Sequence, residues 1–181
     1  MSRTIGAALA VGASVAMLVV STTTAEAAQA TSHATAEESS FVQLQVEHSG
    51  KCLAIANGSL QTGSYAVQST CDESVDHQLF ELRPASSGTF ELRAKHSGSC
   101  LSSNSTNLFV GQRWCFDDST QRWKVRLVEV TKELYQLRSV EAPQYCLAID
   151  FDKPQDDGTP AMLWDCHDAA SQRWRIRPVA S

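Results

Sequence analysis

The chain has 181 residues, of which 43% are hydrophobic and 19% are charged. This length suits one domain and excludes two of ordinary size. The formal net charge of −5 at pH 7 argues against nucleic acid as a partner.

Residues 1–27 have the composition of a secretory signal peptide. Arg3 precedes an apolar segment at 5–20, and Ala25-Glu26-Ala27 is a small-x-small cleavage site, with Ala28-Gln29-Ala30 as a second candidate. A membrane anchor is the alternative. The apolar segment is shorter than the ~20 residues of a span, however, and no basic cluster follows it. We therefore expect a secreted, extracellular protein without a membrane span.

Residues 28–40 are rich in Ala, Thr and Ser and contain no large apolar side chain. This composition predicts a disordered lead-in. The folded domain is expected at 41–178, where all six cysteines lie. An even number of cysteines in a small exported domain favours disulfides, and no two cysteines have the two-residue spacing usual in zinc sites. We expect neither a metal nor a cofactor.

A motif of about 46 residues recurs three times, at about 41–88, 89–133 and 134–178. Its first cysteines are 48 and 46 residues apart, a second cysteine follows after 19, 15 and 20 residues, and a Gln-x-aromatic triplet closes each copy. Six cysteines allow 15 pairings. If the copies fold alike, each disulfide lies within one repeat. The pairs are then Cys52 with Cys71, Cys100 with Cys115, and Cys146 with Cys166.

Each repeat contains four short runs with period-two alternation, separated by turn residues, and no run has helical periodicity. Three four-stranded repeats favour an antiparallel barrel with threefold pseudosymmetry, because closure removes exposed strand edges. The expected strands are 42–46, 52–56, 65–69 and 79–83, then 90–94, 100–101, 108–114 and 122–128, then 135–139, 146–149, 161–165 and 173–177.

The Cys-Leu starts and the Gln-x-Trp closes resemble the ricin-type lectin repeat, and most nearly that of family 13 carbohydrate-binding modules. The resemblance covers 41–178 and implies an all-β fold, a β-trefoil of three four-stranded repeats, each with an internal disulfide. The triplet aromatics Phe80, Trp123 and Trp174 alternate with polar residues, so we expect them in the barrel core.

In that family a sugar pocket combines a carboxylate two residues after the first cysteine, an aromatic two residues before the second, and an Asn-Gln pair at the close. Repeat one departs from this pattern, with Ala54, Ser69 and His77 at the first three positions. Repeat two has Ser102 and Arg113, and its Trp114 is displaced by one residue. Neither copy resembles a functional family site.

Repeat three keeps Trp164 at the aromatic position, His167 after the second cysteine, and Gln172. Ala148 replaces the carboxylate, and Asp150 lies two residues further along the same strand face. Trp164 is therefore either a sugar platform or a packing residue, and Asp150 either a pocket carboxylate or a solvated loop residue. The predicted carbohydrate-binding residues are Asp150, Trp164, His167 and Gln172; Asp156 and Asp157 are alternative carboxylates in an Asp-Asp-Gly turn.

These residues predict a secreted lectin-like module with one weak sugar site in repeat three. The resemblance implies a galactose- or xylose-containing oligo- or polysaccharide as partner. The alternative is a degenerate β-trefoil that binds a protein, as an inhibitor or assembly factor. No motif of a hydrolase, metalloprotease or nucleotide-binding enzyme is present, so we do not expect an enzyme.

Two closing strands also carry alternating basic residues: Arg122, Lys124, Arg126, Arg173, Arg175 and Arg177. They are either the solvated faces of strands, where basic residues discourage edge pairing, or a surface for an anionic glycan.

Overall fold

The structure, a computed structural model, describes residues 41–150 and 155–180. The predicted signal peptide and lead-in lie outside the described residues. Within the described ranges the chain forms twelve β-strands and five one-turn 3-10 helices. No helix in these ranges is long and apolar enough to cross a membrane.

All twelve predicted strands are present, with ends within two residues of the expected ones. Repeat one forms β1 (Phe41–Val46), β2 (Cys52–Ile55), β3 (Ala66–Ser69) and β4 (Phe80–Pro84). Repeat two forms β5 (Phe90–Ala94), β6 (Cys100–Ser103), β7 (Val110–Arg113) and β8 (Trp123–Glu129). Repeat three forms β9 (Leu134–Ser139), β10 (Tyr145–Ile149), β11 (Ala161–Asp165) and β12 (Trp174–Pro178). The short helices are η1 (Ala56–Gly58), η2 (Asp76–Gln78), η3 (Ser86–Gly88), η4 (Ser119–Gln121) and η5 (Ala170–Gln172).

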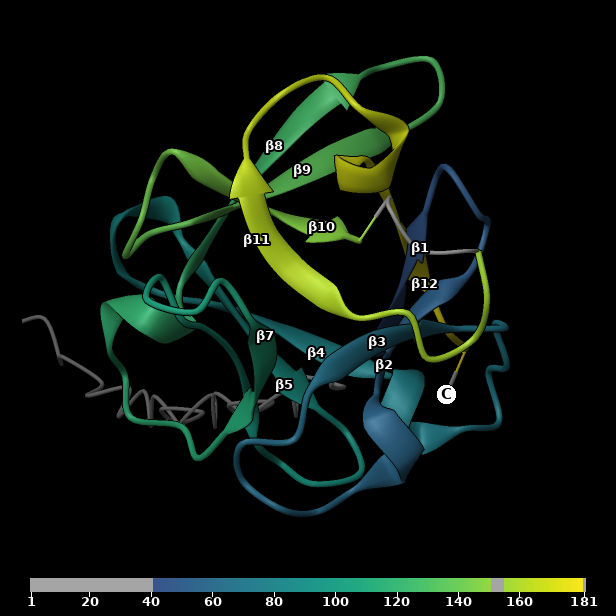
Figure 1. The fold of residues 1–181 in the computed structure, drawn as a ribbon, viewed down its shortest axis with the longest axis vertical. Helices are drawn as coiled ribbons and strands as arrows, with labels where there is room; N and C mark the ends of the chain where they lie inside the picture. Colours follow the sequence, from purple (N-terminus) through teal and green to yellow (C-terminus); the bar gives the residue numbers. More distant parts are fainter. Residues whose placement is uncertain (1–40, 151–154, 181) are drawn as a thin grey trace, which may run out of the picture. The chain divides into compact units, whose positions relative to one another are not determined.

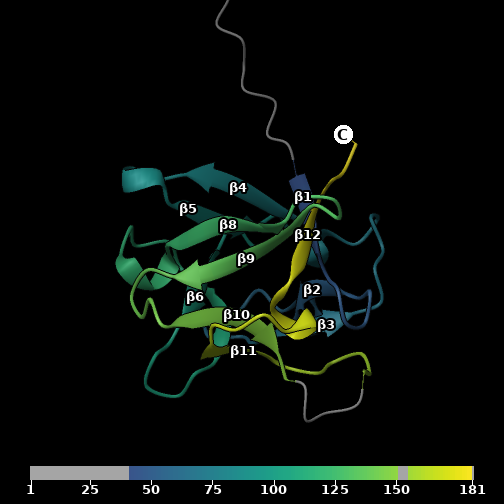
Figure 2. The same ribbon diagram turned by 90° about the horizontal axis from the view of Figure 1, so that it is seen from above.

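Six of these strands close into a barrel. β1 pairs with β12 and β4, β5 pairs with β4 and β8, and β9 pairs with β8 and β12, all antiparallel. The other strands form the hairpins β2–β3, β6–β7 and β10–β11, which lie to one side of the barrel strands in Figure 2. The β-trefoil fold class is therefore confirmed.

The three triplet aromatics fill the barrel, as predicted. Phe80, Trp123 and Trp174 begin β4, β8 and β12, and each is 0% exposed. The two indole N–H groups donate to the carbonyls of Leu101 (3.2 Å) and Leu147 (3.0 Å), so burial leaves neither donor unpaired.

The three hairpins meet through single bridges between residues far apart in sequence: Tyr65 with Gly111, Val67 with Pro160, and Phe109 with Met162. Figure 1 shows β3, β7 and β11 arranged around one centre. A side chain at Gly111 would place its Cβ 2.4 Å from the Ser64 carbonyl oxygen. Only glycine lets these two backbones approach so closely.

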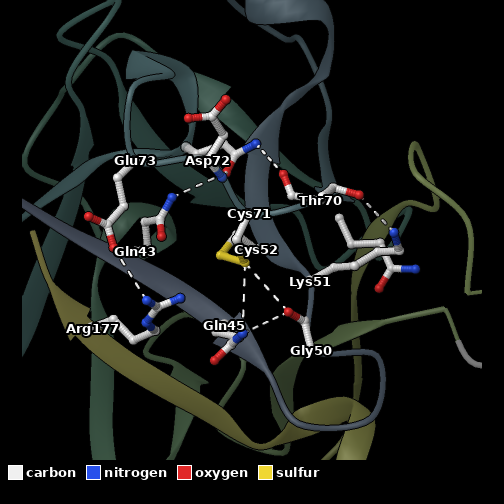
Figure 3. Close-up of a disulfide and its surroundings, with 12 residues drawn as sticks. Gln43, Gln45, Gly50, Lys51, Cys52, Thr70, Cys71, Asp72, Glu73 and Arg177 are labelled. Carbon is white, nitrogen blue, oxygen red and sulfur yellow. Dashed lines mark hydrogen bonds and ion pairs between the residues drawn. A yellow bond between two sulfur atoms is a disulfide. The ribbon is translucent and has the colours of Figure 1, made fainter.

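The disulfides follow the predicted pairing: Cys52 with Cys71, Cys100 with Cys115, and Cys146 with Cys166. Each bond joins the start of one hairpin strand to the residues just beyond its partner strand. Figure 3 shows the first of them, where the Gln45 side chain donates to the carbonyl of Gly50 in the turn before Cys52.

Candidate functional site

The pocket positions predicted from the repeats are structurally equivalent. Side chains directly opposite one another on antiparallel strands share a face. The residue opposite the first cysteine is Ser69 in repeat one, Arg113 in repeat two and Trp164 in repeat three. The residue two positions after that cysteine, on the same face, is Ala54, Ser102 or Ala148.

In repeat three, Trp164 of β11 is half-buried and lies opposite Cys146 of β10. Asp150 follows the end of β10, and its N–H donates to the carbonyl of Pro160 (3.1 Å). Asp150 is four positions after Cys146, a distance of ~13 Å in extended chain. Asp150 and Trp164 therefore lie towards opposite ends of this hairpin.

Gln172 is buried, and both ends of its amide bond to backbone. Its nitrogen donates to the carbonyl of Asp165 (2.8 Å), and its oxygen accepts from the N–H of His167 (2.9 Å). Gln78 and Gln121 clamp the residues around Cys71 and Cys115 in the same way. Gln172 therefore positions the segment around Cys166, a role that its motif alone did not reveal.

His167 is exposed on the segment that Gln172 holds. Its Nδ1 lies 2.7 Å from the Asp165 carbonyl oxygen. The same nitrogen lies 3.2 Å from the Gln172 amide nitrogen, and Nε2 has no hydrogen-bond partner among the described residues. The backbone carbonyl of His167 accepts from the Gln136 side chain (2.8 Å), which ties this segment to β9.

A hollow of about 430 Å³ lies on the repeat-one face, against Ala54, Ser69 and His77. Asp157, which comes from repeat three, also lines this hollow. Its Oδ1 accepts from Lys51 Nζ (2.6 Å) and from the N–H of Thr70 (2.9 Å), two residues labelled in Figure 3. The hydrogen bond from Lys51 is the main cause that lowers the pKa of Asp157.

Two histidines stand near this hollow. The rings of His77 and His96 are 6.1 Å apart, edge to face. Burial lowers the pKa of His77, and the charge of His96 lowers it further. The neutral form of His77 is favoured, so the repeat-one hollow presents an uncharged ring beside the Asp157 carboxylate.

A second hollow, of about 410 Å³, lies on the repeat-two face. Tyr65 and Phe109 stand side by side in its wall, with ring centroids 4.9 Å apart and exposed fractions of 53% and 39%. Polar residues complete the lining, among them Ser102, Asn104, Asn107 and Arg113.

The sequence alone did not predict that Tyr65 and Phe109 form a pair, for two reasons. Tyr65 belongs to repeat one, and Phe109 is not at the family's aromatic position. A ring from each of two hairpins becomes one platform only because Tyr65 bridges Gly111 in the strand that follows Phe109. Trp114, displaced by one residue in the sequence, is 65% exposed and does not line this hollow.

The alternating basic residues of the two closing strands are divided between paired and unpaired cations. Arg122 forms an ion pair with Asp117, Arg173 with Glu47 and Asp168, and Arg177 with Glu73. Lys124, Arg126 and Arg175 form no ion pair within the described ranges. Arg126 and Arg138 line a further hollow of about 360 Å³, next to His167. Among the described residues, no group of three or more His, Cys, Asp or Glu side chains is placed to hold a metal ion.

The sequence matches two family descriptions. Residues 88–181 match the ricin-type β-trefoil lectin domain, and residues 27–108 match the ricin-type β-trefoil lectin domain-like family. A search of curated proteins finds no match.

Solved structures share the fold at low sequence identity. The designed threefold-symmetric protein ThreeFoil is 23% identical with a TM-score of 0.70, over 77% of this chain and 99% of that one. The Macrolepiota procera ricin B-like lectin, solved with lactose, is 17% identical with a TM-score of 0.63, over 77% and 95%. The C-half of the earthworm R-type lectin, solved with GalNAc, is 17% identical with a TM-score of 0.60, over 77% and 99%. Some other matches are parts of longer chains, such as a mosquitocidal holotoxin of which this chain spans 18%.

Proposed function

Because the chain belongs to the ricin-type β-trefoil lectin domain family, we propose that it is a secreted carbohydrate-binding module without catalytic activity, and that its primary sugar site lies in repeat three. One observation carries the choice of site. Trp164 occupies the register position at which Ser69 and Arg113 each line an open hollow in the other two repeats. It is the one aromatic residue at this position.

The chemistry of this face suits a neutral sugar. A half-buried indole covers the apolar C–H face of a pyranose, while hydroxyl groups bind the carboxylate of Asp150 and the ring nitrogen of His167. The ~13 Å between the two ends of the hairpin face exceeds one sugar ring. The proposed ligand is therefore an oligosaccharide lying along β10 and β11, with galactose or xylose units as the family resemblance implies.

The repeat-two hollow is proposed as a second sugar site. Tyr65 and Phe109 offer two partly exposed rings, and the side-chain oxygens of Asn104 and Asn107 accept from backbone N–H groups of their own loop. Their amide nitrogens are donors without a partner among the described residues, and they face a hollow large enough for a sugar ring.

Trp164→Ala tests the primary site. We expect loss of retention on immobilised galactan or xylan, measured by affinity electrophoresis, with a melting temperature close to that of the parent. Trp114→Ala is the matched control, because it removes an exposed tryptophan that lines no hollow described above. Tyr65→Ala reports on the second site in the same gels.

The result has clear alternatives. If Trp164→Ala binds like the parent and Tyr65→Ala does not, the repeat-two hollow is the sugar site. If Trp114→Ala loses as much binding as Trp164→Ala, the repeat-three assignment is wrong. Millimolar to micromolar dissociation constants, or about −4 to −8 kcal/mol, are expected for such an open site.

Export is supported by three disulfides, since such bonds persist outside the reducing cytoplasm. The mass of the protein recovered from the medium of the producing cell tests this proposal. A chain that begins at Ala28 or Thr31 fits the two candidate cleavage sites. Protein found only inside the cell at full length contradicts it.

A protein partner is the second candidate function, favoured by one surface feature. Trp114 and Phe116 flank Cys115 and are 65% and 59% exposed. Large aromatics are common at the centres of protein interfaces. A blank glycan array, together with capture of a specific protein that Trp114→Ala abolishes, would place this function ahead of carbohydrate binding.

A further inference from the structure

The outer face of β8 and β9 carries a concentration of positive charge. Lys124 lies opposite Arg138, and Arg126 lies opposite Gln136. Trp123 points into the barrel, so the alternation along β8 turns Lys124 and Arg126 outward. Like charges directly opposite on neighbouring strands are destabilising. The fold therefore keeps three cations together at a cost in stability.

These cations are not neutralised by acidic side chains. Arg126, Arg138 and Lys124 form no ion pair within residues 41–150 and 155–180. The acid in the lining of the adjacent hollow is Asp168, and it already pairs with Arg173 (3.1 Å). In a chain with net charge −5, this face is a local region of positive potential.

Comparison of the repeats shows that Arg138 is released from a structural role. Gln45, Arg93 and Arg138 are equivalent, since each is paired with the first cysteine of its repeat. The side chains of Gln45 and Arg93 donate to the carbonyls of Gly50 and Gly98, both at 2.7 Å. Each glycine lies in the turn just before the first cysteine of its repeat.

Repeat three has Gln144 where the other repeats have that glycine. The Arg138 side chain makes no hydrogen bond to another described residue, although the residue is half-buried. Its guanidinium therefore keeps all its donors for a ligand.

The hollow beside these residues has a defined wall. It measures about 360 Å³, and His167 and Cys166 close it on the side of β11. Gln136 fixes that side by donating to the His167 carbonyl (2.8 Å). Arg126 on β8 and Arg138 on β9 thus face a hollow whose third side is held in place by a hydrogen bond.

We infer that this hollow is an anion subsite, which binds the carboxylate or sulfate group of an acidic polysaccharide through Arg126 and Arg138, with Lys124 beside them. Guanidinium groups bind such oxyanions through paired hydrogen bonds. The inference rests on the proposed carbohydrate function for the polymer, but the anion site itself is independent of the Trp164 face.

The test compares three polymers by affinity electrophoresis: polygalacturonate, dextran sulfate and neutral galactan. The variant Arg126→Gln/Arg138→Gln is expected to bind the acidic polymer at least about tenfold more weakly and to bind galactan like the parent. Its melting temperature should be equal or higher, because the charge opposite Lys124 has been removed. Binding of the parent to the acidic polymer should weaken as salt rises.

A matched variant, Arg83→Gln/Lys95→Gln, removes the same charge from cations that pair with Glu81 and Asp76. It should retain acidic-polymer binding. The carboxylate and sulfate arms tell which group the site prefers.

Three results would overturn the inference: a parent that binds neither acidic polymer, an Arg126→Gln/Arg138→Gln variant that binds within twofold of the parent, or equal losses in the two double variants. Loss of galactan binding in Trp164→Ala alone would concern the proposed sugar site and leave the anion subsite standing.

Discussion

Gln172→Ala distinguishes a scaffold role from a direct contact with sugar. The sequence places Gln172 among the ligand-binding residues, whereas the structure buries it completely and gives it two backbone hydrogen bonds around Cys166. Each such bond contributes a net ~0.5–1.5 kcal/mol, and the truncated side chain leaves a small cavity. The expected loss is therefore about 2–3 kcal/mol of the free energy of unfolding.

For a domain of this size that loss lowers the melting temperature by about 6–12 °C. Urea unfolding followed by tryptophan fluorescence, with disulfides intact, should show a lower midpoint and an unchanged slope. Gln121→Ala is the matched control, since Gln121 makes the same two bonds around Cys115. It should lose as much stability but keep repeat-three sugar binding, whereas Gln172→Ala should weaken that binding by loosening His167.

A different pattern would refute this reasoning. If Gln172→Ala melts within about 2 °C of the parent and still loses sugar binding, the amide contacts the ligand directly. Its two backbone bonds would then not carry the stability assigned to them.

Three further changes test the packing and the electrostatics. Gly111→Ala should lower the free energy of unfolding, measured in urea, by about 1–3 kcal/mol, because the new Cβ meets the Ser64 carbonyl. It should also weaken the sugar binding that depends on Tyr65. Trp174→Phe places the repeat-one residue type of Phe80 in repeat three. It should lower the free energy of unfolding by about 1–3 kcal/mol in the same assay, because the buried Leu147 carbonyl loses its donor and a void remains. Asp157→Asn should lower the melting temperature more at pH 7 than at pH 2. The folded-state pKa of Asp157 is lowered, so its stabilisation is present above the unfolded value near 3.8 and is lost as pH falls through the folded value. Equal melting-temperature differences at both pH values would show that the Lys51 contact contributes nothing.

Much of the scaffold was predictable because its signals are local and repeated. The spacing of the cysteines and of the Gln-x-aromatic triplets indicated three equivalent units, and equivalence selected one disulfide pairing out of 15. Period-two alternation located every strand and directed Phe80, Trp123 and Trp174 inward. Successive side chains of a strand point to opposite faces of the sheet, so each strand shows its own alternation of apolar and polar residues.

The candidate sites were less predictable, because they depend on which repeats become neighbours. Asp157 was expected in a turn, and the turn is present, but its carboxylate crosses to Lys51 of repeat one. Trp164 was placed correctly on its hairpin face by counting from Cys166. The position of Asp150, two residues beyond Ala148, was likewise predicted from the sequence.

The sequence by itself determined the repeat, the strands, the disulfides and the core, since each follows from patterns within about 46 residues. Only the tertiary structure decided that Tyr65 meets Phe109. It also decided that the Arg138 side chain keeps its donors, whereas those of Gln45 and Arg93 donate to a turn carbonyl. The physical reason is that bridges between hairpins and pairing between barrel strands join residues of different repeats. No local pattern records those contacts, and they are where the three copies differ in what they can bind.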